Sequence, residues 1–543
     1  MPRVPFFILE TICASPSHFF SLLHNEFHHL SCGTDTHDRD DPPIRWEENP
    51  DNGIRAGVGG TLRSLVHTFA AVSAFLTPLL QLQRFFLPSL LALLVWAMWR
   101  TVFRRDLAVG LALYLGLVIL VDGYLNTGLY LPGFEKGSIR YSEICAGFLL
   151  ITRPPAPPQR PPRRVVSWMI ALYFVLLMVS AFQTDPMLAG IFDVRRLIVP
   201  QVISFLIAKR GLGSAEGYRR FFVWLTALIL IIGVFVFWEV FFDRVILKSE
   251  ILALPAYWHN VAQRRFGGVF LNPNYLGAFV VLVFPPAFMW ALSEQRPLVR
   301  LYAWTGLLAL VFCLVETEAR AAVLASGIAM LFLTFGPSGG VSRRRRLALF
   351  ALLIVVVTVV MPGFYERAVR RFDTLDEDTS TDYATSRAVT WRYTLRIIAD
   401  HPLGGIGFGE RQFMKSMDAY GFSKEYGIKS LDAPHNSYLQ VAVYAGIPAL
   451  AAFLLANALL LGKSALVFLR GAADGSLHIA FGLAVGISGF LMCVFTDLQL
   501  IQAVAPVYWL FFALLLALVT AAPAADPAMP SSGGRKPTPA LDR

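Results

Sequence analysis

Long apolar runs separated by short polar stretches dominate the chain from Leu65 onward. A helix that spans the hydrocarbon core of a membrane needs about 20 consecutive apolar residues, and many windows reach that length. The predicted spans lie near 65–82, 85–103, 107–125, 165–183, 221–242, 275–293, 300–317, 319–336, 347–363, 435–461, 477–497 and 501–521. Two shorter runs, near 141–152 and 195–208, are either re-entrant or extended by poorly marked flanks. The pattern predicts an all-α polytopic membrane protein with about 12 to 14 transmembrane helices.

The composition agrees with a membrane protein. Of the 543 residues, 56% are hydrophobic and 15% are charged, with a mean hydropathy of +0.57, whereas soluble domains carry about 25% charged residues. The net charge of +10 lies in short basic clusters between apolar runs, which is typical of cytoplasmic loops and does not indicate a nucleic-acid partner. The five cysteines are scattered without a C-x-x-C pair, so the sequence predicts neither a metal site nor a disulfide framework.

Basic segments between the spans predict the orientation of the chain. The positive-inside rule assigns to the cytoplasm Arg343 to Arg346, the cluster from Lys209 to Arg220, and the Pro-rich linker 153–164. This assignment places 184–194, 243–274 and 364–434 outside, and both termini inside.

The polarity of the chain divides it into five parts. Residues 1–60 are polar and are predicted to be a disordered extension, because so little apolar content cannot offset the entropy of ordering. The other parts are predicted to be transmembrane helices with short loops in 61–363, a large outer loop in 364–434, C-terminal transmembrane helices in 435–521 and a disordered cytoplasmic tail in 522–543. Within the large loop, the apolar spacing over 384–398 predicts a helix lying against the membrane.

Three groups of polar residues stand at the predicted outer ends of spans. They are Arg264 to Gly268 followed by Asn272-Pro273-Asn274, then Glu316 to Arg320, and then His435 to Tyr438. Ionisable groups at membrane depth are costly and are therefore candidates for function. Arginines can hold a pyrophosphate by charge-assisted hydrogen bonds, and a histidine can take the proton of an attacking hydroxyl. A clamp for the leaving group and a base are the minimum that a glycosyl displacement requires.

Each group also has a purely structural interpretation. Arg320 could extend its head toward water or pair with Glu318. His435 could cap a helix or satisfy a buried carbonyl. Asn272 and Asn274 have the pattern of an ordinary turn and helix N-cap.

These residues resemble the O-antigen ligase family, which includes lipopolysaccharide ligases and related polysaccharide polymerases. The resemblance covers roughly residues 220–500. It is carried by Arg265-Phe266-Gly267-Gly268 with Asn272-Pro273-Asn274, Glu318-Ala319-Arg320, Ser386-Arg387 with Trp391, His401 to Gly409, and His435 to Leu439 with Gly446. The chain departs from the family at the arginine turn, where a serine or glycine neighbour is usual and Glu318 and Ala321 stand here.

The resemblance implies a metal-independent, inverting glycosyltransferase without a cofactor, in the bacterial inner membrane. Its donor would be a glycan on undecaprenyl pyrophosphate, and its acceptor, reached at the periplasmic face, would be the lipid A–core, a growing polysaccharide or a protein. The implied base is His435, and the implied pyrophosphate ligands are Arg320, Arg387 and Arg265. Supporting roles fall to Asn436, Glu318, Asn272, Asn274 and Trp391.

Two alternatives remain open from the sequence. A polysaccharide polymerase of the same family differs from a ligase only in its acceptor. A transporter or flippase for a lipid-linked sugar or small solute would have a similar number of spans. Transporters bind their substrates near the midplane of the membrane, however, whereas the polar groups of this chain lie at one face.

Overall fold

The structure is a computed structural model that describes eleven stretches of the chain. They are 106–122, 140–151, 164–242, 264–336, 342–348, 351, 387–426, 432–469, 477–497, 500 and 504–521. The chain divides into two compact units, 1–87 and 88–543, and every described residue belongs to the second. The predictions for the N-terminal extension, for the spans near 65–82 and 85–103, for most of the 347–363 span, for the Pro-rich linker and for the C-terminal tail lie outside the described residues.

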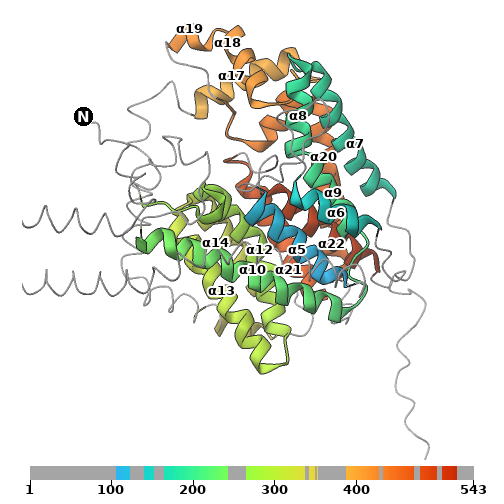
Figure 1. The fold of residues 1–543 in the computed structure, drawn as a ribbon, viewed down its shortest axis with the longest axis vertical. Helices are drawn as coiled ribbons and strands as arrows, with labels where there is room; N and C mark the ends of the chain where they lie inside the picture. The colour runs from blue at the N-terminus through green and yellow to red at the C-terminus, as the bar shows by residue number, and fades with distance from the viewer. Residues whose placement is uncertain are drawn as a thin grey trace, which may run out of the picture. The chain divides into compact units, whose positions relative to one another are not determined.

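Every regular element in the described part of the chain is helical (Figure 1). The α-helices are α5 (Leu107–Gly116), α6 (Tyr141–Ile151), α7 (Arg164–Ser180), α8 (Met187–Leu197), α9 (Val199–Ala208), α10 (Ala215–Phe242), α12 (Pro273–Ser293), α13 (Pro297–Thr317), α14 (Arg320–Phe335), α17 (Arg387–Asp400), α18 (Glu410–Ala419), α19 (Phe422–Tyr426), α20 (Ser437–Leu469), α21 (Leu477–Cys493) and α22 (Ala505–Ala521). Short π or 3-10 turns are η1 (Leu117–Val121), η2 (Ala181–Gln183) and η4 (Gly268–Phe270).

Five described helices are long and apolar enough to cross a membrane. They are Val165–Gln183, Ala215–Phe242, Pro273–Ser293, Pro297–Thr317 and Ser437–Leu469. Five shorter apolar helices accompany them: Leu107–Val121, Tyr141–Leu150, Arg320–Phe335, Leu477–Cys493 and Ala505–Ala521. The prediction of an all-α polytopic membrane protein is confirmed, and the helices follow the predicted apolar runs. The segment 184–194, predicted as an outer loop, contains most of α8.

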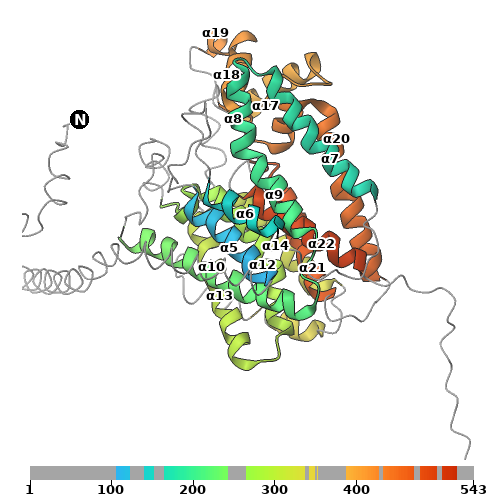
Figure 2. The same cartoon turned by 45° about the vertical axis from the view of Figure 1, so that its right-hand side comes forward.

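Helix α12 is the centre of the bundle, because 94% of its most apolar 18-residue stretch is buried by other parts of the protein. It packs against α13, α14 and α21. A Cβ atom on Gly486 would stand 2.4 Å from the Leu282 carbonyl oxygen, so the absence of a side chain is what lets α21 approach α12 this closely. Helices α7 and α20 run side by side in both views (Figures 1 and 2).

Helix α20 breaks at Gly446, where φ is 85°. The break frees backbone groups that the segment after α17 satisfies: Ile406 N–H donates to Val443 O at 2.9 Å, and Ile447 N–H donates to Pro402 O at 2.7 Å. A Cβ on Gly446 would lie 2.2 Å from the Leu403 carbonyl oxygen, so only glycine fits here. The segment from α17 to α18 is thereby fixed to the first half of α20.

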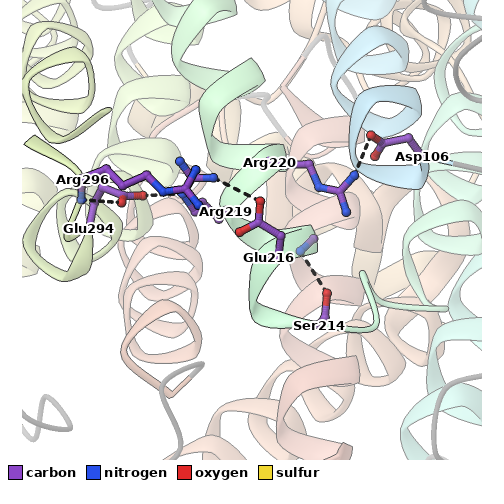
Figure 3. A network of polar contacts seen from close by, with 8 residues as sticks. Asp106, Ser214, Glu216, Arg219, Arg220, Glu294 and Arg296 are labelled. Atoms are coloured by element: carbon purple, nitrogen blue, oxygen red, sulfur yellow. Dashed lines mark hydrogen bonds and ion pairs between the residues drawn. The ribbon is translucent and has the colours of Figure 1, made fainter. Parts of the chain in front are cut away.

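The bundle has two polar ends. We call the site end the region where α10, α13 and α21 finish and α12, α14 and α20 begin. The opposite end holds a network of ion pairs from α5, α10 and the α12–α13 turn (Figure 3). There Arg219 contacts Glu294 at 2.8 Å and Glu216 at 3.1 Å, and Arg220 contacts Asp106 at 2.9 Å.

Candidate active site

The loop before α12 is pinned to the end of α13. Phe266 N–H donates to Glu316 O at 3.0 Å. The Arg265 guanidinium donates to Asn274 Oδ1 at 2.9 Å and to Thr317 O at 3.3 Å. The first two polar groups of the sequence therefore form one assembly at the site end, and Arg265 joins them.

A buried glutamate that the sequence analysis did not single out also holds this loop. Gly268 N–H donates to Glu239 Oε2 at 2.7 Å, and Glu239 is 2% exposed in α10. Burying a carboxylate is costly unless it is hydrogen-bonded. The available signal was a single acidic residue inside the apolar run 221–242.

Two of the predicted supporting residues are helix caps. Asn272 Oδ1 accepts from Asn274 N–H at 2.9 Å at the start of α12, and Asn436 Oδ1 accepts from Tyr438 N–H at 3.0 Å and Leu439 N–H at 3.1 Å at the start of α20. Such side chains satisfy amide groups that the first helical turn leaves unbonded. The structural interpretation of Asn272 is thus confirmed, and a direct role of either asparagine on substrate stays a prediction.

The turn between α13 and α14 presents Arg320 as the first residue of α14. Glu318 closes α13 in the left-handed conformation, with φ of 48°. Ala319 N–H donates to Thr317 Oγ1 at 3.2 Å. The turn is therefore sharp and internally bonded, and it directs α14 away from α13 immediately after Glu318.

His435 stands just before α20, with a buried carboxylate behind it. Its Nδ1 lies 3.8 Å from Asp497 Oδ1, and the side chains are 42% and 7% exposed. The Asp497 backbone accepts from Ser437 Oγ at 2.7 Å, which fixes the end of α21 to the start of α20. The imidazole thus has one side toward a carboxylate and another open to solvent.

Trp391 positions α17 against the same site. Its Nε1–H donates to Pro434 O at 2.8 Å, and its ring packs on Phe495 at 5.6 Å between centroids. The predicted helix over 384–398 is present as α17, and Arg387, exposed, is its first residue. Trp391 therefore has a clear structural role: it ties α17 to the residue before His435.

Further contacts link the arginine turn to the histidine. Cys493 Sγ lies 3.8 Å from Ala321 O, so the beginning of α14 meets the end of α21. Segments from α12, α14, α20 and α21 thus converge, although among the described residues the charged partner of His435 is Asp497 and not a guanidinium.

Backbone strain is concentrated at the site end. Among the described residues, the non-glycine residues with positive φ are Arg264, Leu271, Glu318 and His435, and all four lie in the segments just described. The left-handed region costs an L-residue about 1–2 kcal/mol. Such strain persists only where the surroundings enforce it, and it clusters at functional sites.

Residues 305–454 match the family model described as O-antigen ligase. This part of the chain is therefore similar to the O-antigen ligase family. This finding confirms the resemblance drawn from the sequence motifs. The matched segment contains Arg320, Arg387, Trp391 and His435, whereas Asp497 lies beyond the match. No curated protein matches the chain.

Asp497 is the main residue that the sequence analysis missed. It is 5% exposed and follows α21. The sequence feature that could have revealed Asp497 is that it is an isolated acidic residue at the end of the apolar run 477–497, at a depth where ionisable groups are costly. Its nearness to His435 could not be read from the sequence, because 62 positions separate the two residues.

Proposed function

We propose that this protein is a membrane glycosyltransferase of the O-antigen ligase type. It transfers a glycan from undecaprenyl pyrophosphate to an acceptor hydroxyl at the periplasmic face of the bacterial inner membrane. One observation carries the proposal: within a ligase-family domain, the half-exposed imidazole of His435 has its Nδ1 3.8 Å from the buried carboxylate of Asp497.

The mechanism follows from this pair and the arginines. His435 accepts the proton of the acceptor hydroxyl, and the oxygen attacks the anomeric carbon of the donor. The bond from that carbon to the pyrophosphate oxygen breaks on the opposite side, so the configuration inverts. Asp497 stabilises the imidazolium, and Arg320 and Arg387 hold the departing pyrophosphate, with assistance from Arg265.

The distribution of basic residues supports a periplasmic site. Arg346 donates to the Gly336 carbonyl oxygen at 2.9 Å, which places the run of four arginines at the end of α14 remote from Arg320. Arg219 and Arg220 also lie at the opposite end. Cytoplasmic ends carry the excess of lysine and arginine, and the site end would therefore face outward.

The decisive variant is His435→Asn. Asparagine tolerates the left-handed backbone of position 435 better than alanine does, and its amide is no base. Loss of a general base lowers turnover by about 10²–10⁴-fold. Transfer is measured with purified protein in detergent, undecaprenyl-pyrophosphate-linked oligosaccharide and lipid A–core.

The matched control is His401→Ala, which removes an exposed imidazole from the end of α17. It should retain full turnover. Undiminished transfer by His435→Asn would refute the assignment of the base. A wild-type protein without any turnover in detergent, but with transbilayer movement of the lipid-linked sugar in vesicles, would instead identify a flippase. Replacing lipid A–core with a second donor glycan distinguishes a polymerase.

A further inference from the structure

Gln440 is a buried polar residue close to His435 that the mechanism above does not use. It lies in the second turn of α20 and is 1% exposed. Its Nε2 donates to Tyr444 Oη at 3.5 Å, one helical turn further along. In the described part of the chain its Oε1 has no hydrogen-bond partner.

An orphan acceptor of this kind requires an explanation. Most buried side-chain polar atoms in folded proteins have a partner, and leaving one without a partner costs the desolvation of that atom. An apolar side chain of similar shape would avoid that cost. The Gln440 amide is therefore poorly explained by packing of α20 alone, and it is suited to accept a hydrogen bond from a bound molecule.

Gln440 contacts Tyr444, and Tyr444 in turn contacts the segment between α17 and α18. Gly407 N–H donates to the Tyr444 carbonyl oxygen at 3.3 Å, and the Phe408 and Tyr444 rings lie 5.3 Å apart. These contacts bring the start of α18, with Glu410, against Tyr444.

This set of side chains matches the chemistry that binds sugars. Amide and carboxylate oxygens accept hydrogen bonds from hydroxyl groups, and aromatic rings offer apolar area with a polar edge. Asn436 and Gln440 are four residues apart and so share a face of α20. Gln440 therefore follows His435 by little more than one helical turn.

We propose that Gln440 is a specificity-determining residue that accepts a hydrogen bond from a sugar hydroxyl of the glycan positioned at His435. The inference rests on the proposed function, which it deepens by assigning a sugar subsite beside the base. The hydroxyl belongs to the donor or to the acceptor glycan. The two sources share the same chemistry and are separated by which Michaelis constant changes.

The test is Gln440→Met, which keeps the length of the side chain and removes the acceptor. Because one hydrogen bond to substrate is lost, KM for one of the two glycans should rise about 10-fold. The substrates are undecaprenyl-pyrophosphate-linked oligosaccharide and lipid A–core, each varied with the other saturating. Gln440→Glu retains an acceptor oxygen and should keep KM within about threefold of the wild type.

The melting temperature, compared with KM, distinguishes a contact to substrate from a purely structural role of Gln440. Gln440→Met removes the orphan oxygen but also the donor to the buried Tyr444 hydroxyl, so the two effects oppose each other and its melting temperature should stay close to that of the wild type. The control is Asn457→Leu on the same helix, where Asn457 Oδ1 accepts from Tyr508 Oη–H at 2.6 Å and Nδ2–H donates to Phe453 O at 3.0 Å. It should melt lower and leave both KM values unchanged.

The outcomes separate this proposal from the proposed function. If His435→Asn is inactive and Gln440→Met raises neither KM, the subsite is wrong while the base assignment stands. A lower melting temperature for Gln440→Met with unchanged KM values would show that Gln440 only supports packing. If His435→Asn is fully active, the proposed function fails whatever Gln440→Met does.

Discussion

The two polar ends of the bundle differ in the groups that their charged side chains contact. At the opposite end, Arg219 lies between Glu216 and Glu294, and Arg296 N–H also donates to Glu294 at 2.9 Å (Figure 3). At the site end, Arg265 and Glu239 bond to backbone and amide groups, and His435 Nδ1 lies 3.8 Å from Asp497 Oδ1.

The backbone shows the same contrast. Arg264, Leu271, Glu318 and His435, the described non-glycine residues with positive φ, all lie at the site end. The orphan acceptor of Gln440 is there as well. An end built only for stability would relax its backbone, as the described residues of the opposite end do. The difference indicates that the site end is shaped for a ligand, at some cost to stability.

The largest effect that tests this contrast is expected for Asp497→Asn. The variant keeps the size of the side chain and the backbone carbonyl that accepts from Ser437, but it removes the charge behind the imidazole. Partners that orient a functional group typically contribute about 10–100-fold to activity, and turnover should fall by that factor. Asp400→Asn, an exposed carboxylate bonded to Tyr420 at 2.6 Å, is the control. Full turnover of Asp497→Asn would show that the pair is incidental.

The opposite end should respond in stability rather than in activity. Arg219→Ala leaves Glu294, 5% exposed, without its ionic partner, and we expect a loss of about 2 kcal/mol, between the values for exposed and buried pairs. Thermal unfolding in detergent measures the loss, and turnover per folded molecule should not change. The control is Glu216→Ala, whose side chain is 51% exposed and should cost at most about 1 kcal/mol. A drop in turnover per folded molecule would contradict the division of roles.

The smallest effect is expected from Asp193 in α8. Burial raises the pKa of its carboxyl, against the opposing effect of Arg196 and Arg411. The folded protein then favours the protonated form, so this contribution to stability is present at low pH and is lost as pH rises from about 4 through the raised pKa. Asp193→Asn should therefore melt slightly above the wild type at pH 7.5, with the difference shrinking toward pH 4.

The control for this effect is Asp185→Asn, which removes one negative charge from an exposed position just before α8. Melting curves of the wild type and both variants at pH 7.5 and pH 4 measure the difference in melting temperature. If Asp193→Asn melts below the wild type at pH 7.5, the carboxylate stabilises the contact with α18 and the sign of the prediction is wrong.

Most of the fold could be predicted from hydrophobicity alone. The apolar runs that predicted spans near 221–242 and 275–293 became α10 and α12 with ends shifted by a few residues. Helix α8 was missed because three charged residues interrupt its apolar sequence. Its eleven residues are also too few for a transmembrane signal. Its helix is explained by packing against α9 and η2, which is a tertiary effect.

The candidate site was predictable only in part. Arg265, Asn272, Asn274 and Asn436 were singled out because polar groups at membrane depth are costly, and the structure shows their local bonds. Glu239 and Gln440 were not found, because each is a single polar residue within an apolar stretch of its helix, and no spacing rule shows what such a residue faces. Only the contacts across helices reveal what such a residue faces.

The sequence by itself determined that this chain enters the membrane many times, where most of the described helices lie, and that residues 305–454 resemble the O-antigen ligase family, since length, hydrophobicity and local motifs are properties of short segments. Tertiary structure decided that Asp497 lies behind His435, that Glu239 holds the Arg265 loop, and that Gln440 keeps an unmet acceptor. These facts depend on contacts between helices far apart in the chain, where close packing and the cost of buried polar atoms select the partners.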